Sequence, residues 1–328
     1  MARRALGPAT LQVVQAVAAA LDGTDTALVT ACSGGPDSLA LVVGAQHAAS
    51  RRGLPHTVVV VDHGLQPGSA AVAARAAATV TGLGLGLGVA DVRQVQVRVD
   101  PHDGSGPEAA ARRSRYAALD AESAAVAGGP ATVLLGHTRD DQAETVLLGL
   151  ARGSGSRSLA GMAPRTGPYL RPLLGLDRAV TVATCAELGL EPWSDPHNDD
   201  PAYARVRVRR RVLPVLEDEL GPGVAAALAR TAALARDDAD LLDALAADAD
   251  PGTDTLGCAE LAALPAALRR RVLRRWLARH GSEDLQLDHV LAVEALVQDW
   301  HGQRAVHVPR GTVARHQGRL LWQAVGRG

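Results

Sequence analysis

The feature that most constrains the fold is a polar loop, Ser-Gly-Gly-Pro-Asp-Ser at residues 33–38, set between two apolar runs. Residues 27–32 are short, apolar and partly β-branched, which predicts a buried strand. Residues 39–46 continue as a helix that Pro36 and Asp37 open. A strand, a glycine turn and a helix start together form an anion site, because the first N–H groups of a helix are free. An ordinary strand-to-helix turn is the alternative, but two hydroxyls and an acid favour a phosphate loop.

The chain contains no lysine, so this is not the lysine-bearing P-loop, which places a lysine on the terminal phosphates. A polyphosphate would repel Asp37 unless a divalent cation lay between them. We therefore expect Mg²⁺, with Asp37 as its protein ligand. The residues expected to bind the nucleotide phosphates are Ser33, Gly34, Gly35, Pro36, Asp37 and Ser38.

Length, charge and cysteine content set the broad class. A chain of 328 residues, 47% of them apolar, is long enough for two domains. The net charge of −1 gives no overall attraction for nucleic acid, so any such affinity must come from local patches. The three cysteines are scattered and form no CxxC pair, which argues against a zinc ribbon or a disulfide framework. The sequence shows no signal peptide and no membrane-spanning run, and we expect a cytoplasmic protein.

Short apolar runs alternate with alanine-rich helical stretches from about residue 10 to about residue 190. This alternation predicts an α/β fold, a Rossmann-like parallel sheet with helices on both faces. Ligands of such sheets bind beyond the carboxyl ends of the strands, where the phosphate loop also falls. The expected strands are 26–32, 57–62, 89–97 and 132–136. The expected helices are 10–21, 37–50, 69–81, 107–126 and 139–151.

The composition changes after about residue 200, and we expect a second, smaller and mostly helical domain. We place the two domains at 1–218 and 219–328, with helices over 221–249 and 261–280 and short β-like runs over 303–323. Two groups of arginines stand out. Arg205, Arg207 and Arg209 end the first domain, and Arg270, Arg271, Arg274 and Arg275 lie on the expected helix 261–280. A helix spacing of four puts the second group in two rows, which favours a nucleic-acid surface over its alternative, a solvated face.

Two other strand ends carry polar residues. Asp62 and His63 follow the second expected strand. They could simply start a loop, but beside a phosphate loop we interpret them as part of a nucleotide pocket. Gly136 and His137 follow the fourth expected strand, and we assign them to the same pocket.

An acidic cluster opens the helix that follows His137. Asp140 and Asp141 lie four and three residues before Glu144, so these acids share a helix face. Charge complementing the helix dipole is the alternative, and it would account for one acid. Three acids indicate a site for a metal or a cationic substrate.

Arg112 and Arg115 form a further pair with helical spacing. A solvated helix face is the alternative to a site for phosphate or an RNA backbone.

The loop resembles the pyrophosphate loop of the N-type ATP pyrophosphatases, which cleave ATP between the α and β phosphates. Further segments, in order along the chain, resemble the tRNA(Ile)-lysidine synthase family. They are Val-Asp-His-Gly-Leu-Gln-Pro-Gly-Ser at 61–69, residues 108–116, Gly-His-Thr-Arg-Asp-Asp-Gln-Ala-Glu-Thr at 136–145, Arg-Gly-Ser-Gly-Ser at 152–156, Arg-Pro-Leu-Leu at 171–174 and Trp-Ser-Asp-Pro-His-Asn at 193–198. The resemblance covers most of residues 26–218 and extends more weakly to about 322. One departure is Val206, where the family usually has asparagine.

The resemblance implies the reaction and the roles. ATP adenylates the carbonyl oxygen at position 2 of the wobble cytidine in the CAU anticodon of tRNA(Ile), and the ε-amine of free lysine then displaces AMP. Asp37, Asp141 and Glu144 would be catalytic, the last two receiving the ammonium groups of lysine. The residues that would bind substrate or tRNA are Arg112, Arg115, Asp140, Asp141, Glu144, Arg205, Arg207, Arg209, Arg270, Arg271, Arg274 and Arg275.

Residues 1–218 would then be the ATP-binding domain and residues 219–328 the tRNA-binding domain. Two other functions stay open at this point: a tRNA thiolase of the same superfamily, and a non-catalytic ATP-binding module. We expect no membrane partner, and the sequence leaves a homodimer open.

Overall fold

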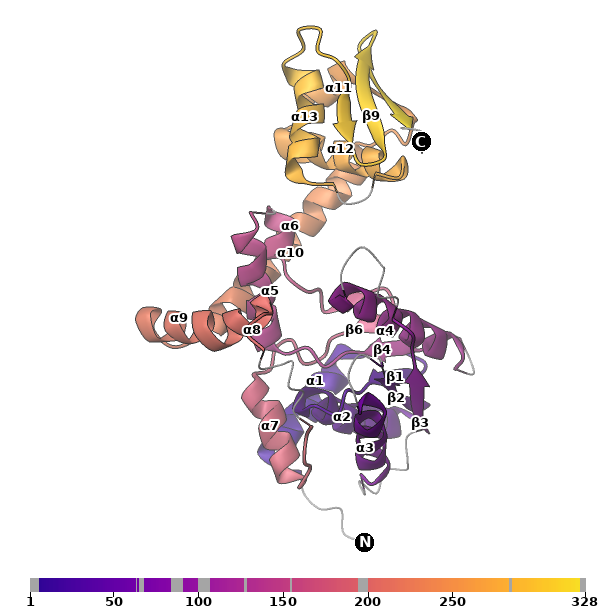
Figure 1. Ribbon diagram of the computed structural model, residues 1–328, viewed down its shortest axis with the longest axis vertical. Helices are drawn as coiled ribbons and strands as arrows, with labels where there is room; N and C mark the ends of the chain where they lie inside the picture. The colour runs from indigo at the N-terminus through magenta and orange to yellow at the C-terminus, as the bar shows by residue number, and fades with distance from the viewer. Residues whose placement is uncertain are drawn as a thin grey trace. The chain divides into compact units, whose positions relative to one another are not determined.

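The computed structural model describes residues 6–62, 64, 68–83, 91–99, 107–126, 129–153, 155–193, 200–282 and 285–324 (Figure 1). The chain divides into unit 1, Met1–Leu148 with Gly161–Arg230, and unit 2, Gly149–Ala160 with Thr231–Gly328. Residues 149–160, which no sequence feature set apart, thus belong with the second part of the chain. Among the helices of the described residues, none has the length and apolar character needed to cross a membrane.

Unit 1 contains a six-stranded sheet with the order β3-β2-β1-β4-β6-β5. The strands are β1 (Leu28–Ala31), β2 (His56–Asp62), β3 (Asp91–Gln96), β4 (Thr132–Leu134), β5 (Arg165–Thr166) and β6 (Tyr169–Leu170). β5 is antiparallel to β6, and every other pair is parallel. The predicted parallel α/β sheet is therefore confirmed. The edge hairpin of β5 and β6 was not expected, because strands of two residues carry no periodic pattern.

Helices cover both faces of this sheet because successive strand residues point to opposite sides. On one side Leu28 and Leu134 pack against α1 (Pro8–Ala20) and α2 (Pro36–Arg52). On the other side Val29 and Val133 pack against Leu119 of α4 (Pro107–Ala124). The other helices of unit 1 are α3 (Ser69–Thr81), α5 (Arg139–Ala151), α7 (Arg178–Glu187), α8 (Ala204–Arg207) and α9 (Leu213–Leu220). The last residues of α5 belong to unit 2. α10 (Val224–Asp248) begins in unit 1, and its residues from Thr231 onward belong to unit 2.

A buried carboxylate ties the amino ends of the central strands together. The side chain of Asp25 is fully buried, and Arg165 Nη2 donates to both of its oxygens at 3.0 and 2.9 Å. Thr132 Oγ1 and the backbone N–H of Asp22 also donate to this carboxylate.

Replacing Asp25 with alanine should destabilise unit 1, because Arg165 and Thr132 would lose their acceptor. We expect a loss of about 3 kcal/mol in the free energy of unfolding, measured by urea titration. Asp91→Ala is the matched control, since Asp91 is 54% exposed in its ion pair with Arg93 and should cost at most about 1 kcal/mol. Equal losses in both variants would contradict a special role for Asp25.

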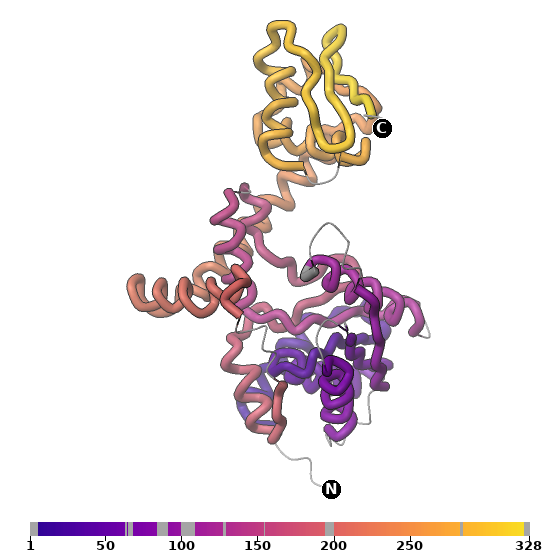
Figure 2. Tube along the Cα trace, viewed as in Figure 1, coloured from indigo at the N-terminus to yellow at the C-terminus, as the bar shows by residue number. Residues whose placement is uncertain are grey.

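Unit 2 combines helices with a four-stranded antiparallel sheet of order β7-β10-β9-β8 (Figure 2). Its strands are β7 (Thr255–Gly257), β8 (Val306–Val308), β9 (Gly311–His316) and β10 (Arg319–Ala324). Its helices beyond α10 are α6 (Ser156–Leu159), α11 (Cys258–Ala263), α12 (Ala266–Arg279) and α13 (Leu287–Gln298). The single helix expected over 261–280 is therefore wrong: α11 ends before Pro265, which precedes α12 as its N-cap residue. The core centres on Trp276, which is fully buried among Leu256, Val313 and Leu320.

Candidate active site

The phosphate loop follows β1, and its own side chains fix its shape. Ser38 Oγ accepts a hydrogen bond from Ser33 N at 3.2 Å and donates one to Gly35 O at 2.9 Å. Gly34 has a φ of 83°, a left-handed conformation that a β-carbon would strain. Pro36 lies in the first turn of α2, where a missing N–H breaks no helical bond. The other N–H groups of this turn have no intrahelical acceptor and can therefore bind an anion.

Asp37 projects from the first turn of α2 and is held by α7. Thr181 Oγ1 donates a hydrogen bond to Asp37 Oδ1, and Arg178 Nη1 lies 3.7 Å from Asp37 Oδ2. Burial raises the pKa of Asp37, Arg178 opposes this rise, and the charge of Asp141 adds to it. Asp37 and Asp141 therefore share one electrostatic site, although they come from different helices.

The end of β4 lies against the phosphate loop. A β-carbon on Gly136 would lie 3.1 Å from Asp37 O and 3.2 Å from Ser38 N, so a larger residue would push the two backbones apart by a few tenths of an ångström. Asp62, at the end of β2, is buried and accepts a hydrogen bond from Gly64 N at 3.0 Å. His63, which we assigned to the same pocket, lies outside the described residues.

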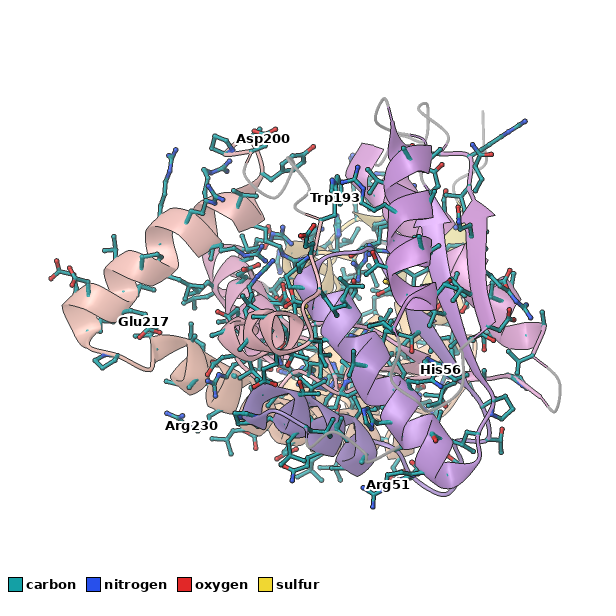
Figure 3. All side chains as sticks on the ribbon, turned by 90° about the horizontal axis from the view of Figure 1, so that it is seen from below. Arg51, His56, Trp193, Asp200, Glu217 and Arg230 are labelled. Atoms are coloured by element: carbon teal, nitrogen blue, oxygen red, sulfur yellow. The ribbon has the colours of Figure 1, made fainter. Side chains whose placement is uncertain are left out.

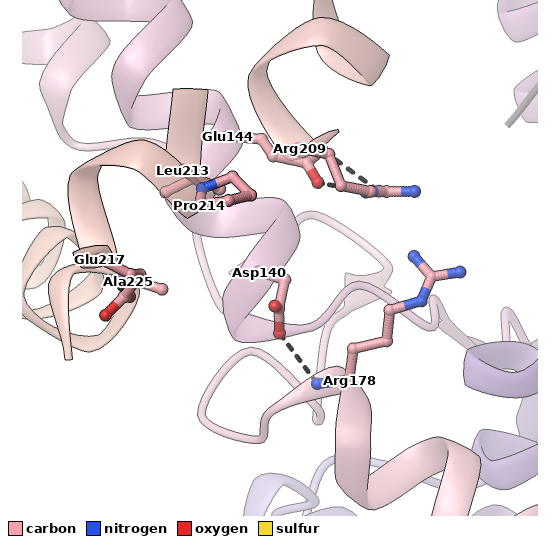
Figure 4. Close-up of a pocket in the computed structure, with 8 residues that line it drawn as sticks. All are labelled: Asp140, Glu144, Arg178, Arg209, Leu213, Pro214, Glu217 and Ala225. Carbon is pink, nitrogen blue, oxygen red and sulfur yellow. Dashed lines mark hydrogen bonds and ion pairs between the residues drawn. The ribbon is translucent and has the colours of Figure 1, made fainter. Parts of the chain in front are cut away.

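Glu144 on α5 is fully buried, and Arg209 compensates its charge (Figure 4). Arg209 Nε lies 2.5 Å from Glu144 Oε1, and Arg209 Nη2 lies 3.2 Å from Oε2, a bidentate pair. Arg209 Nη2 also lies 3.2 Å from Asp141 Oδ1, and Arg205 Nε lies 3.5 Å from Glu144 Oε2. Burial raises the pKa of Glu144, while Arg209 acts in the opposite direction. The acids that we assigned to lysine thus contact arginines that we assigned to tRNA.

The backbone around Arg209 is unusual. Residues Val208–Val212 form a π-helical turn between α8 and α9. Such turns are rare and occur frequently at functional sites, where the added residue changes the direction of the side chains. Val206, in α8, is buried and offers no side-chain hydrogen bond at the position where the family usually has asparagine.

Glu144 and Arg209, together with Asp140 and Arg178, line a cavity of about 210 Å³. Asp140 Oδ2 accepts a hydrogen bond from Arg178 N at 2.8 Å and so ties α5 to the start of α7. The guanidinium groups of Arg178 and Arg209 extend to the same side of the cavity (Figure 4). Glu217 of α9 (Figure 3) caps the start of α10 by accepting hydrogen bonds from Gly223 N and Ala225 N at 2.5 and 2.9 Å. The lining residues are Asp140, Glu144, Arg178, Arg209, Leu213, Pro214, Glu217 and Ala225.

Three arginines, Arg112, Arg115 and Arg171, form a cationic group around His137. The pKa of His137 is lowered to about 4, mainly by burial; Asp141 opposes this shift, and Arg171, Arg112 and Arg115 add to it. Burial also lowers the pKa of Arg115, as do the charges of Arg112 and Arg205. His137 Nδ1 and Arg171 Nε are buried with no hydrogen-bond partner among the described residues. Buried polar atoms of this kind indicate a site for a ligand, here an anionic one.

Lowering the pH should destabilise the protein through His137. The folded-state pKa of about 4 lies below the ordinary value of 6.5, so between these values the unfolded chain binds a proton that the folded chain does not. This stability is present above pH 6.5 and is lost as the pH falls towards 4. Between pH 7 and pH 5, His137→Gln should lose about 2 kcal/mol less than the parent protein in urea titrations. His316→Gln, at an exposed histidine, is the control; an unchanged pH dependence in His137→Gln would contradict this reasoning.

These residues fit a nucleoside triphosphate and Mg²⁺. The loop supplies N–H groups for phosphate, and the group around His137 supplies positive charge. Mg²⁺ usually takes one or two protein carboxylates and completes its shell with phosphate oxygens and waters. Asp37 offers such a carboxylate beside the loop. A cage of three or more His, Cys, Asp or Glu side chains is absent from the described part of the chain, and this mode of binding does not require one.

The remaining arginines of the sequence prediction lie elsewhere. Arg207 donates to the carbonyl oxygens of Pro201 and Ala202, both at 2.7 Å. The four arginines of α12 belong to unit 2, whereas the loop and the acids belong to unit 1. Arg112, by contrast, belongs to the group around His137 and donates to Tyr116 Oη at 3.0 Å.

Sequence reasoning missed three residues of the site. Arg178 and Thr181 contact Asp37 from α7, and Arg171 belongs to the group around His137. The sequence does carry a pattern that could have indicated Arg178 and Thr181. Asp177 is a typical N-cap residue, and in the helix that follows it Arg178 and Thr181 lie three residues apart on one face. Arg171 stood in a segment quoted for the family resemblance but was given no role.

Two known protein families match this chain, one in each of its two parts. A family described as the PP-loop domain matches residues 9–216, and a family described as the TilS substrate binding domain matches residues 256–321. The tRNA(Ile)-lysidine synthase of Leifsonia xyli subsp. xyli is 55% identical over 298 residues, covering 88% of this chain and 87% of the relative. That of Thermobifida fusca is 53% identical over 306 residues, covering 90% and 91%. The solved structure of a U34-tRNA thiolase from Methanococcus maripaludis, 16% identical, covers 68% of this chain and 78% of its own with a TM-score of 0.52, which shows a shared fold.

Proposed function

The chain belongs to the tRNA(Ile)-lysidine synthase family, and from this premise we propose that it ligates free lysine to the wobble cytidine of the CAU anticodon. It is an ATP-dependent enzyme of the PP-loop class that modifies tRNA(Ile). The observation that carries the proposal is the buried cluster of Glu144, Asp141 and Arg209 beside the phosphate loop. A site for adenylation alone would not need a second, buried pair of acids.

In the first step the carbonyl oxygen at position 2 of the cytosine attacks the α-phosphorus of ATP, and pyrophosphate leaves. The N–H groups at the start of α2 and the hydroxyls of Ser33 and Ser38 hold the phosphates. Asp37 would hold Mg²⁺, which supplies neutralisation of phosphate charge when bound. Arg178 adds a cation close to the same carboxylate, 3.7 Å from Asp37 Oδ2.

In the second step the ε-amine of lysine attacks carbon 2 of the base, and AMP leaves with the oxygen. Lysine arrives as an ammonium ion and must lose a proton before it attacks. Burial raises the pKa of Glu144, which makes it a stronger base than an exposed carboxylate. For lysine to reach Glu144, Arg209 must give up part of its bidentate contact, and the leaving phosphate offers the guanidinium another partner.

The thiolase alternative finds less support. Cys32 and Cys185 flank the loop but are buried, and burial raises the pKa of both, that of Cys185 to about 11. Such thiols are poor nucleophiles at neutral pH. Cys258 lies in unit 2.

The proposal predicts the order in which the substrates are needed. With ATP, Mg²⁺ and an unmodified tRNA(Ile) transcript, label from the α-phosphate of ATP should enter the tRNA. Adding lysine should release that label as AMP while labelled lysine enters the tRNA. A non-catalytic ATP-binding module would release no AMP, and a thiolase would not incorporate lysine. Either result would contradict the proposal.

A further inference from the structure

Acidic and basic residues are unevenly distributed along the sequence of unit 2, although the net charge of the whole chain is only −1. Residues 231–299 contain thirteen Asp and Glu residues against seven arginines. Residues 300–328 contain five arginines and three histidines and no acid. This acid-free segment includes β8, β9 and β10 and the loop after α13. A polyanion would therefore meet one part of unit 2 much more favourably than the rest.

The arginines of α12 are largely neutralised within the unit. Arg269 and Arg270 share Glu294, with N–O distances of 2.8 and 2.7 Å. Arg271 lies 2.8 Å from Asp243, and Arg275 lies 3.6 Å from Asp250, which Arg279 also contacts. Arg274 instead has a neutral partner, the carbonyl oxygen of Leu285 at 3.1 Å. Because the other arginines of α12 pair with acids of the same unit, α12 offers a polyanion less than its sequence suggested.

The sheet has one apolar and one polar face. Val313 and Leu320 of β9 and β10 join the core, so alternate residues of these strands point away from it. Antiparallel pairs place His307 opposite Thr312, and His316 opposite Arg319, on that outer face. His307, His316 and Arg319 are exposed. Arg319 donates to Thr255 Oγ1 at 2.9 Å, a neutral partner that leaves its charge uncompensated.

An exposed aromatic ring lies beside the sheet on the side of α13, since its partner Arg315 shares the face of Val313. Trp300, just beyond α13, is 39% exposed, and the guanidinium of Arg315 lies over its ring at 5.3 Å. Arg315 is held there by the carbonyl oxygens of Leu296 and Val297, at 3.0 and 3.4 Å. Arg304 follows four residues later and is exposed. An aromatic ring beside fixed positive charge suits an RNA strand, which presents both phosphates and unstacked rings.

We propose that the surface formed by the outer face of β8–β10 and the loop at Trp300 binds the phosphate backbone of the tRNA, and that α12 does not. This inference rests on the proposed function for the identity of the RNA. Arg304 and Arg319 contribute phosphate contacts, and Trp300 contributes a stacking contact. No carboxylate in residues 300–328 opposes the approach of the strand.

The test compares two double variants that remove the same charge. Arg304→Gln/Arg319→Gln alters the proposed surface, and Arg270→Gln/Arg275→Gln alters two exposed arginines of α12 that pair with acids. Binding of an unmodified tRNA(Ile) transcript is measured across a salt series. The first variant should bind about 10-fold more weakly near 0.1 M salt, with a log–log salt slope smaller in magnitude by about one to two. The second should keep the slope of the parent protein.

Trp300→Ala supplies a second signature. It should weaken binding by about fivefold or more at every salt concentration, because stacking is not ionic, and leave the slope unchanged. The proposal would be overturned if the two double variants weakened tRNA binding equally, or if only the α12 variant weakened it. Unchanged tRNA binding in both the Trp300 variant and the first double variant would also overturn it. Lysidine formation by the parent protein is assayed in parallel: its absence would refute the proposed function, whereas its presence with unaltered binding in the variants would refute this surface alone.

Discussion

In the presence of tRNA, Asp37→Ala should release pyrophosphate from ATP at least about 10²-fold more slowly than the parent protein. This is the usual effect of losing one transition-state charge contact. Asp37 is the carboxylate at the start of α2, with Thr181 and Arg178 fixing its position. Its removal takes away the expected Mg²⁺ ligand and leaves Arg178 without its anion. Binding of tRNA should change little, because the affected atoms face the nucleotide. The measurement is single-turnover pyrophosphate release with saturating tRNA.

Ser38→Ala provides a second variant of the same loop. Ser38 Oγ joins Ser33 N and Gly35 O, so its loss should loosen the loop and slow the same step by about 10²-fold. Asp91→Asn, at an exposed carboxylate on β3, is the matched control and should keep the parent rate. Near-normal pyrophosphate release in both loop variants would show that the loop does not carry the adenylation step.

Glu144→Gln should slow the transfer of lysine to adenylated tRNA by about 10²-fold or more, the lower range for loss of a general base. It should also destabilise the protein by about 3 kcal/mol, because the half-buried Arg209 would lose its bidentate carboxylate and be left with Asp141 at 3.2 Å. Adenylation should be affected less than lysine transfer. The measurement is a chase in which preformed adenylated tRNA receives lysine.

The double variant Glu144→Gln/Arg209→Met separates catalysis from folding. Removing both charges leaves neither member of the Glu144–Arg209 pair unpaired, so stability should return part of the way to that of the parent protein, while Asp141 loses its contact with Arg209. Lysine transfer should stay slow, since the base is still missing. Recovery of transfer together with stability would show that Glu144 only neutralises Arg209. Glu122→Gln, which breaks an ion pair of 2.9 Å with Arg93 away from the site, is the matched control.

The elements that could be predicted are those that local pattern determines. The first five helices and first four strands fall within a few residues of their expected bounds, because apolar runs, Pro36 and the alanine-rich stretches are local signals. Asp37, Asp141 and Glu144 could be proposed together because parallel strands end at one edge of the sheet, where their helices begin. Val272 and Trp276, one helical turn apart, are both fully buried and anchor α12.

The parts that escaped prediction depend on contacts between distant segments. The contact of Arg209 with Glu144 spans 65 positions and requires a π-helical turn, which has no sequence pattern of its own. The charges of α12 looked available because their partners are distant in sequence: Glu294 lies 24 positions from Arg270, and Asp243 lies 28 from Arg271. Spacing within a helix shows which charges share a face, but not which acids the fold brings to that face.

The most direct test of the central claim is mass spectrometry of an unmodified tRNA(Ile) transcript with a CAU anticodon, incubated with the protein, ATP, Mg²⁺ and lysine. The nucleoside at the wobble position should gain the mass of lysine less one water, and it should do so only when all four components are present. A transcript with a UAU anticodon should remain unchanged, because its wobble base is not cytosine. An unaltered wobble cytidine in the complete reaction, or a gain of sulfur instead of lysine, would contradict the account.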